Sequence, residues 1–167
     1  INSKSGITFS EEYKEYNLKS HVHGIPNIKL EDYVDRKVIR FMGPGSAYNY
    51  IAMTEAVKDS GLEEKDVSNI STGMIMGSGG PSIKNVILAA DKTREKTPKK
   101  MGPFVVPRTM SSTASATLAV PFKIKGVNYT ISSACATSGH CIGNAMELIQ
   151  LGKQNIVFAG GSDEVHY

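Results

Sequence analysis

The sequence predicts an α/β protein in which helices are layered on a parallel or mixed sheet. Two apolar, glycine-containing segments typical of buried strands lie at Gly73–Gly77 and Asn155–Gly161, and a β-branched, aromatic segment lies at Val127–Ser132. Segments with helical spacing separate these strands. Strands that alternate with helices in this way pair in parallel, because each helix returns the chain to the same edge of the sheet.

The first 45 residues are loop-rich and charged, and only short helices are predicted there. One lies near Ser10–Tyr16 and a second spans Leu30–Met42. The apolar face of the second comprises Val34, Val38 and Phe41.

A longer helix is predicted to follow Ser46, which has the side chain of an N-cap residue, and to end at Gly61. Its apolar face has the spacing i, i+3, i+4, i+7 and comprises Tyr50, Met53, Thr54 and Val57.

The strand Gly73–Gly77 runs into a turn, Ser78–Pro81, after which Ser82 can cap a helix that extends to about Ala90. The glycines here form neither a complete dinucleotide-binding fingerprint nor a P-loop, so they indicate a tight turn and close packing. Further along, the small residues of Thr109–Val120 favour close helix packing.

The last predicted helix runs from about Cys135 to Leu151, with Gly152 just past its end. The side chains predicted to form its buried face are Ile142, Ala145, Met146 and Ile149. The strand Asn155–Gly161 follows, and Gly160 and Gly161 would let the backbone pass close to a site at the sheet edge.

Composition places the chain among ordinary globular domains, since 40% of its 167 residues are hydrophobic and 21% are charged. No apolar run approaches the ~20 residues of a membrane span. The start, INSKSGITFS, has no initiator Met and no signal-like region, and the two cysteines lack metal-type spacing. These features predict a cytoplasmic protein with no bound metal and no membrane partner.

The net charge of +3 is unevenly distributed. The segment Lys84–Arg108 has seven basic and two acidic residues, a local net charge of +5, so the rest of the chain sums to −2. This segment is either a solvated loop or a surface for an acidic partner. Its single aromatic residue, Phe104, is too few for base stacking along the segment, which argues against nucleic acid.

Cys135 is the strongest candidate for a catalytic residue. The predicted strand stops at Ser132 and a helix begins immediately at Cys135, which is the geometry of a nucleophile elbow. A thiol in the first turn of a helix faces the positive end of the helix dipole, which favours the thiolate that attacks carbonyl carbon. The backbone N–H of Cys135 can serve as an oxyanion donor. The alternative is a small cysteine that packs beneath the strand.

The other candidate residues are interpreted as structural. Cys141 points to a different side of the helix from Cys135 and is predicted to be a core residue. His140 is interpreted as packed or hydrogen-bonded. No pair among the remaining histidines forms a metal site; these are His21, His23 and His166.

The segment SSACATSGHCIGNA, at Ser132–Ala145, resembles the active-site cysteine motif of the β-ketoacyl-[acyl-carrier-protein] synthases, specifically those of type I. Further matching segments keep the order found in that family and cover nearly the whole chain: Ser5–Ser10, Asp35–Met42, Gly77–Gly80, Gly102–Met110, Pro121–Ser138 and Ile149–Gly161.

The resemblance implies a thiolase-like fold of two similar halves per subunit in a homodimer. Residues 1–167 would then be a fragment of the N-terminal domain. The first strand would precede Ile1, and the whole C-terminal half, with two catalytic histidines and a lysine, would follow Tyr167. Such a fragment is expected to be inactive alone and poorly soluble.

The resemblance also implies roles for particular residues in fatty acid elongation. Cys135 would accept the acyl group and then undergo decarboxylative condensation with malonyl-carrier protein. Gly80 and Met110 would line the acyl pocket, with Pro81 replacing a more usual glycine and leaving the chain-length preference open. No cofactor is implied beyond the phosphopantetheine of the acyl carrier protein. The residues matching the carrier-docking surface are Lys37, Arg40, Lys96 and Lys99.

Two alternatives to an enzyme remain. One is a non-catalytic partner subunit of the same superfamily, whose hallmark is loss of the cysteine. The other is a binding or scaffold module in which Cys135 only packs and the basic segment docks an acidic protein.

Overall fold

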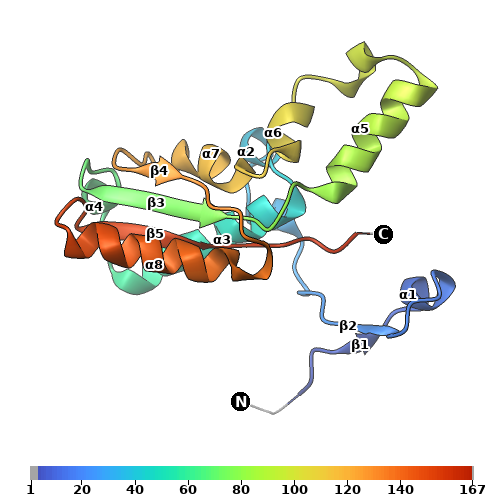
Figure 1. Cartoon of the computed structure of the whole chain (residues 1–167), viewed down its shortest axis with the longest axis horizontal. Helices are drawn as coiled ribbons and strands as arrows, with labels where there is room; N and C mark the ends of the chain where they lie inside the picture. Colours follow the sequence, from blue (N-terminus) through green and yellow to red (C-terminus); the bar gives the residue numbers. More distant parts are fainter. Residues whose placement is uncertain (1–3, 167) are drawn as a thin grey trace.

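A three-stranded parallel sheet forms the centre of the computed structural model, which describes residues 4–166. The strand order is β4-β3-β5, where β3 is Thr72–Gly77, β4 is Asn128–Tyr129 and β5 is Ile156–Gly161. Both neighbours pair in parallel with β3 (Figure 1). The predicted α/β fold with a parallel sheet is confirmed.

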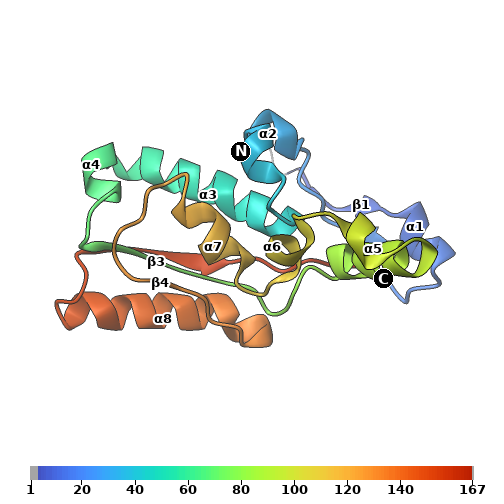
Figure 2. The same ribbon diagram turned by 90° about the horizontal axis from the view of Figure 1, so that it is seen from above.

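Helices cover both faces of this sheet (Figure 2). On one side lie α3 (Pro44–Ser60) and α7 (Thr113–Ala119), and on the other lies α8 (Thr137–Gln150). Successive side chains of β3 point to opposite faces of the sheet, so they contribute to two separate parts of the core. Met74 and Met76 pack in a cluster on the α3 and α7 side, whereas Ile75 packs against α8.

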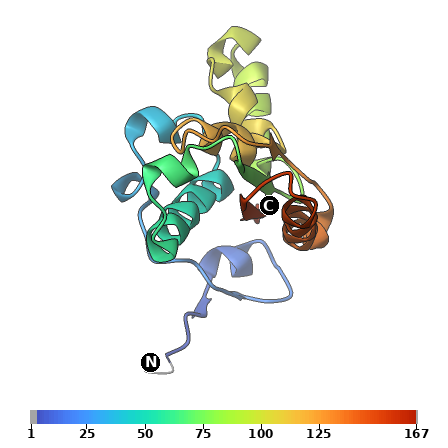
Figure 3. The ribbon, with the colours of Figure 1, turned by 90° about the vertical axis from the view of Figure 1, so that its left-hand side faces the viewer.

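Two segments extend away from the layered body (Figure 3). At one end, α5 (Ile83–Glu95) leads to the 3-10 turn η2 (Pro98–Met101) and back through α6 (Val105–Thr109). The basic segment is therefore mainly helix rather than loop. At the other end lies an antiparallel hairpin; its elements are β1 (Thr8–Phe9), α1 (Glu11–Glu15) and β2 (Val22–His23).

The helix predicted over Leu30–Met42 is wrong as a single element. The chain forms a 3-10 turn, η1 (Leu30–Asp32), and then a short helix, α2 (Arg36–Ile39). The break arises because the Asp35 carboxylate accepts a hydrogen bond from the Lys37 N–H at 2.6 Å, which starts a new helix.

The start of α3 also differs from the prediction, because Pro44 begins the helix and Gly43 is its N-cap. The predicted cap, Ser46, lies inside the helix, where its hydroxyl is 2.8 Å from that of Thr117 on α7. The predicted end is confirmed, since Gly61 adopts a left-handed φ of 69°. A short helix, α4 (Glu64–Val67), connects α3 to β3.

The predicted packing face of α8 is largely wrong. Ile142 and Met146 are 58% and 54% exposed; of the predicted face only Ala145 packs against the sheet, together with Cys141 and Leu148. The helix has two apolar stripes, and the sheet covers the one with smaller side chains. Likewise β5 is half-buried rather than fully buried, as its residues pair only with β3 among those the structure describes.

No helix in residues 4–166 is both long and apolar enough to cross a bilayer.

Candidate active site

Cys135 lies in a turn at the carboxyl edge of the sheet. The chain leaves β4, passes through the 3-10 turn η3 (Ala134–Ala136) and enters α8 at Thr137. The thiol is exposed. The elbow predicted from the sequence is therefore present, but Cys135 precedes α8 rather than occupying its first turn. Ala136 is the N-cap residue of α8.

The Thr137 hydroxyl ties the two residues before Cys135 to the start of α8. It accepts a hydrogen bond from the Ser133 N–H at 2.8 Å and donates one to the Ala134 carbonyl at 2.8 Å. Thr137 is only 2% exposed, so these bonds are shielded from water. Ala134 has a left-handed φ of 46°, a conformation that a non-glycine residue adopts only when its surroundings fix it.

Glycines let neighbouring segments approach the turn closely. A Cβ on Gly77 would collide with the Thr137 methyl group and the Ile131 carbonyl, and would lie 3.0 Å from the Cys141 sulfur. A Cβ on Gly79 would lie 3.2 Å from the Ala134 Cα. Gly77 and Gly79 therefore serve close packing, as predicted, whereas a Cβ on Gly80 would meet nothing within 4 Å.

A hollow of about 330 Å³ opens beside the Cys135 thiol. It brings Cys135 together with Gly80, one of the two predicted acyl-pocket residues. Met110, the other, ends α6 and does not line this hollow. The lining residues are Ser78, Gly79, Gly80, Pro81, Ile83, Ala134, Cys135, Asp163 and Glu164.

Asp163 and Glu164 belong to this site although nothing in the sequence analysis selected them. The Asp163 carboxylate accepts a hydrogen bond from the Gly79 N–H at 2.7 Å, and Glu164 Oε2 accepts one from the Ser82 hydroxyl at 2.6 Å. Their position could have indicated them. They directly follow β5, and the carboxyl ends of parallel strands meet at one edge of the sheet.

Cys141 is a core residue, as predicted. It is 0% exposed beneath the sheet, and burial raises the pKa of its thiol more than a backbone hydrogen bond with Ile131 lowers it. His140 is exposed rather than packed. Across the described residues there is no cluster of three or more His, Cys, Asp or Glu side chains that could hold a metal ion.

The four predicted docking residues are all exposed but form two separate pairs. Lys37 and Arg40 lie on and just after α2, beside the body of the molecule. Lys96 and Lys99 lie beyond the far end of α5, whose 13 residues span about 20 Å.

Arg40 is held in place rather than free. Its guanidinium lies 5.4 Å from the ring centre of Phe41 and 5.2 Å from that of Phe104. The Arg40 carbonyl accepts a hydrogen bond from Arg108 Nε at 2.8 Å, which ties α6 to the end of α2.

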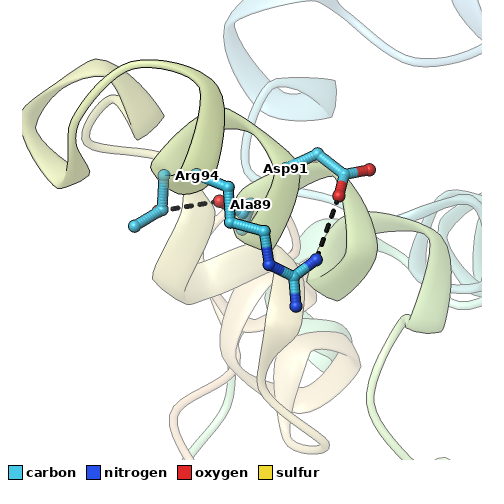
Figure 4. A network of polar contacts seen from close by, with 4 residues as sticks. Ala89, Asp91 and Arg94 are labelled. Carbon is cyan, nitrogen blue, oxygen red and sulfur yellow. Dashed lines mark hydrogen bonds and ion pairs between the residues drawn. The ribbon is translucent and has the colours of Figure 1, made fainter.

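Three further bases adjoin Arg40 in a second hollow of about 410 Å³; two of them bound the basic segment found in the sequence, and only Arg36 was missed. They are Arg36, Lys84 and Arg108. Not every base on α5 adds free charge, since Arg94 reaches back to Asp91 at 3.3 Å (Figure 4).

The comparisons with known proteins define the class of this chain. Residues 3–166 match the family model described as the N-terminal domain of β-ketoacyl synthase. The chain therefore belongs to the β-ketoacyl synthase family, and the cysteine elbow on a parallel sheet agrees with that assignment.

The curated relatives point to one particular branch of the family. The chain is 52% identical over 165 residues to 3-oxoacyl-[acyl-carrier-protein] synthase 1 of Haemophilus influenzae, and 53% identical over 166 residues to that of Escherichia coli K12. A synthase 2 from Rhizobium meliloti is 32% identical. The alignments cover 98% and 97% of this chain but only 41% and 40% of the two synthase 1 proteins.

Solved structures confirm the fold. A β-ketoacyl synthase from Burkholderia phymatum superposes with a TM-score of 0.82 at 25% identity, covering 98% of this chain and 41% of that one. The ishigamide ketosynthase/chain length factor gives a TM-score of 0.81 at 20% identity. The chain thus has the fold of the N-terminal part of a ketosynthase.

Proposed function

We propose that the protein containing this chain is a 3-oxoacyl-[acyl-carrier-protein] synthase of fatty acid elongation, with Cys135 as its acyl-accepting nucleophile. The observation that carries the proposal is the exposed thiol on a turn fixed by Thr137, beside a hollow at the carboxyl edge of the sheet. The identity to synthase 1 proteins supports the same reaction.

In the first half-reaction, the Cys135 thiolate attacks the carbonyl carbon of the acyl thioester on the carrier. A carbon–sulfur bond forms to Cys135, and the phosphopantetheine thiol leaves with the proton that Cys135 gave up. The Cys135 N–H donates to the oxyanion of the tetrahedral intermediate.

In the second half-reaction, malonyl-carrier protein loses CO₂, and the resulting carbanion attacks the acyl-Cys135 carbonyl. The new carbon–carbon bond forms as the carbon–sulfur bond to Cys135 breaks, which gives a 3-oxoacyl product two carbons longer. The resemblance assigns the second oxyanion donor and the decarboxylation histidines to the C-terminal half of the family. The 167-residue chain alone is therefore proposed to be inactive.

Substrate contacts are proposed for two regions. Gly80 and Met110 line the acyl pocket, and Gly80 already shares the hollow with Cys135. Met110 would contribute where the partner subunit of a homodimer meets this one. The carrier protein is acidic in this family, and the cationic residues proposed to dock it are Lys37, Arg40, Lys96 and Lys99. Catalysis in the cytoplasm needs no cofactor beyond the carrier's phosphopantetheine.

The nucleophile is tested by replacing Cys135→Ala in the full-length protein. After incubation with acylated carrier protein, mass spectrometry should detect one added acyl group on the wild type and none on the variant. Condensation with malonyl-carrier protein should stop in the variant. Cys141→Ala, which removes the buried thiol, is the control and should still be acylated. Acylation or condensation by the Cys135→Ala variant at near wild-type rate would exclude this assignment.

A further inference from the structure

Glu164 joins the starts of two long helices. Its Oε1 accepts a hydrogen bond from the Gly45 N–H in the first turn of α3 at 3.1 Å, and its Oε2 accepts one from the Ser82 hydroxyl at 2.6 Å. Ser82 is the N-cap residue of α5. Neither helix has a capping hydrogen bond from its own N-cap side chain, since Gly43 has none and Ser82 is directed to Glu164. One carboxylate therefore occupies the favourable position at both positive helix ends.

The surrounding backbone leaves room for this carboxylate. A Cβ on Gly43 would lie 2.9 Å from Glu164 Oε1, and a Cβ on Gly45 would lie 2.7 Å from the Ser162 hydroxyl. Ser162 in turn accepts a hydrogen bond from the Asn49 side-chain amide of α3 at 3.1 Å. The segment after β5 is thus fitted closely against the start of α3.

The same segment holds the glycine loop Ser78–Ser82 at two points. Asp163 binds the Gly79 N–H, and Glu164 binds Ser82 at the other end of the loop. Within the loop, the Ser78 hydroxyl donates a hydrogen bond to the Gly80 carbonyl at 2.6 Å.

This loop forms one wall of the hollow beside Cys135. Gly79 approaches the Ala134 backbone, next to Cys135, so a shift of the loop changes the space in front of the thiol. Because Ser82 also begins α5, loosening its contact with Glu164 would move the loop and the start of that helix together.

We propose that Glu164 is a positioning residue that acts through Ser82 and the glycine loop to set the shape of the hollow at Cys135. By this means it sets the length of the substrate or reagent chain that can reach the Cys135 thiol. The effect on acyl substrates rests on the function proposed above, whereas the effect on access to the thiol does not depend on it.

The test compares two thiol reagents on the full-length protein, iodoacetamide and the long-chain N-dodecylmaleimide. Glu164→Ala should change the ratio of their alkylation rates at Cys135 by ~10-fold, less than the ~10²-fold that a 1 Å misplacement of the reacting groups can cost, because a wall of the hollow moves and the thiol does not. Ser82→Ala should give a similar change, and the double variant should not exceed Glu164→Ala, because both substitutions break the hydrogen bond between Glu164 and Ser82. Glu164→Gln can still bond to Gly45 and Ser82 and should restore most of the wild-type ratio. Glu55→Ala, an exposed carboxylate on α3, is the matched control.

Two outcomes would overturn the proposal. One is a lowered melting temperature in Glu164→Ala with an unchanged alkylation ratio, which would make the residue structural only. The other is a change in the alkylation ratio in the Glu164→Ala, Ser82→Ala double variant that equals the combined changes of the two single variants. Assaying condensation across acyl chain lengths separates the two hypotheses: an altered ratio in a protein that does not condense acyl chains would refute the proposed function but not the role of Glu164.

Discussion

The elbow at Cys135 and the basic surface along α2, α5 and η2 are built in opposite ways. Around Cys135 the backbone is fixed by a nearly fully buried hydroxyl and by glycines that leave no space for a Cβ. At the far end of α5, Lys96 and Lys99 are exposed on a segment that extends from the body.

The difference corresponds to the two tasks proposed. Attack on a carbonyl carbon requires placement to a fraction of an ångström, and a displacement of 1 Å costs about 10²-fold in rate. Attraction of an acidic partner acts over about 10 Å in physiological salt and tolerates mobile side chains. Arg40, whose guanidinium packs against the Phe41 and Phe104 rings, lies between these extremes.

The largest effect should come from removing the hydroxyl that fixes the elbow. Thr137→Val keeps the shape of the side chain but leaves the partly buried Ser133 N–H without its acceptor. We expect the acylation rate of Cys135 in the full-length protein to fall about 10²-fold, measured by quenched-flow mass spectrometry. Thr137→Ser keeps the hydroxyl and should restore most of the rate. A loss in Thr137→Ser with little change in Thr137→Val would assign the effect to the methyl group instead.

Gly77→Ala should reduce stability and disturb the elbow, because the new Cβ meets Thr137 and the Ile131 carbonyl. The expected loss is about 2 kcal/mol of the free energy of unfolding, measured by urea denaturation of the full-length protein. Gly139→Ala, where a Cβ meets nothing within 4 Å, is the control and should be close to neutral or slightly stabilising. Similar losses at the two positions would contradict the close-packing interpretation.

Charge reversal next to the body should affect only reactions that use the carrier protein. Lys37→Glu combined with Arg40→Glu is expected to lower kcat/KM for acyl-carrier protein about 10-fold, with the deficit shrinking as salt is raised. Turnover of small acyl thioesters should change little. A matched loss with both substrate types would indicate a folding defect, since Arg40 also packs on Phe41 and Phe104.

Neutralising the end of α5 should have a smaller effect on the same reaction. We expect Lys96→Ala with Lys99→Ala to lower kcat/KM for acyl-carrier protein about threefold, because exposed charges on an extended segment contribute little each. A loss larger than that of the α2 variant would show that this segment dominates docking and would reverse the comparison.

The smallest effect is expected at an exposed ion pair far from either surface. The hydrogen bond and charge of Lys123 hold the pKa of Glu64 below its ordinary value of 4.5, so the pair stabilises the fold above that value and the contribution disappears as the pH falls through the folded pKa. Both groups are exposed, so Lys123→Met should leave the melting temperature unchanged within error at pH 7 and at pH 3. A clear drop confined to pH 7 would show that the pair matters.

The sequence predicted the three strands of the sheet because they are marked by local composition, although β4 spans only Asn128–Tyr129 of the predicted Val127–Ser132. The parallel arrangement, the position of Cys135 in a turn and the core role of Cys141 follow from residues close together in the chain. The helix end at Gly61 was also predictable, since a glycine in the left-handed conformation is a local signal.

The features that sequence reasoning missed depend on contacts between distant segments. Serine is a typical N-cap residue, yet the Ser82 hydroxyl donates its hydrogen bond to Glu164, 82 positions later in the chain. The first residue of α8 is set by the bond between Thr137 and the strained turn before it, which no periodicity reveals. The packing face of α8 was ambiguous because both stripes are apolar, and only the shape of the sheet selects Leu148 and leaves Ile142 and Met146 exposed.

The different exposure of the two cysteines makes the local opening of α8 measurable by thiol labelling. Cys135 is exposed, whereas Cys141 is enclosed between α8 and the sheet beneath Gly77. Under native conditions a thiol reagent should therefore react rapidly with Cys135. It should react with Cys141 only when α8 separates from β3 and β5. The slow phase of that labelling measures the free energy of separating the helix from the sheet, residue-specifically and without unfolding the whole molecule.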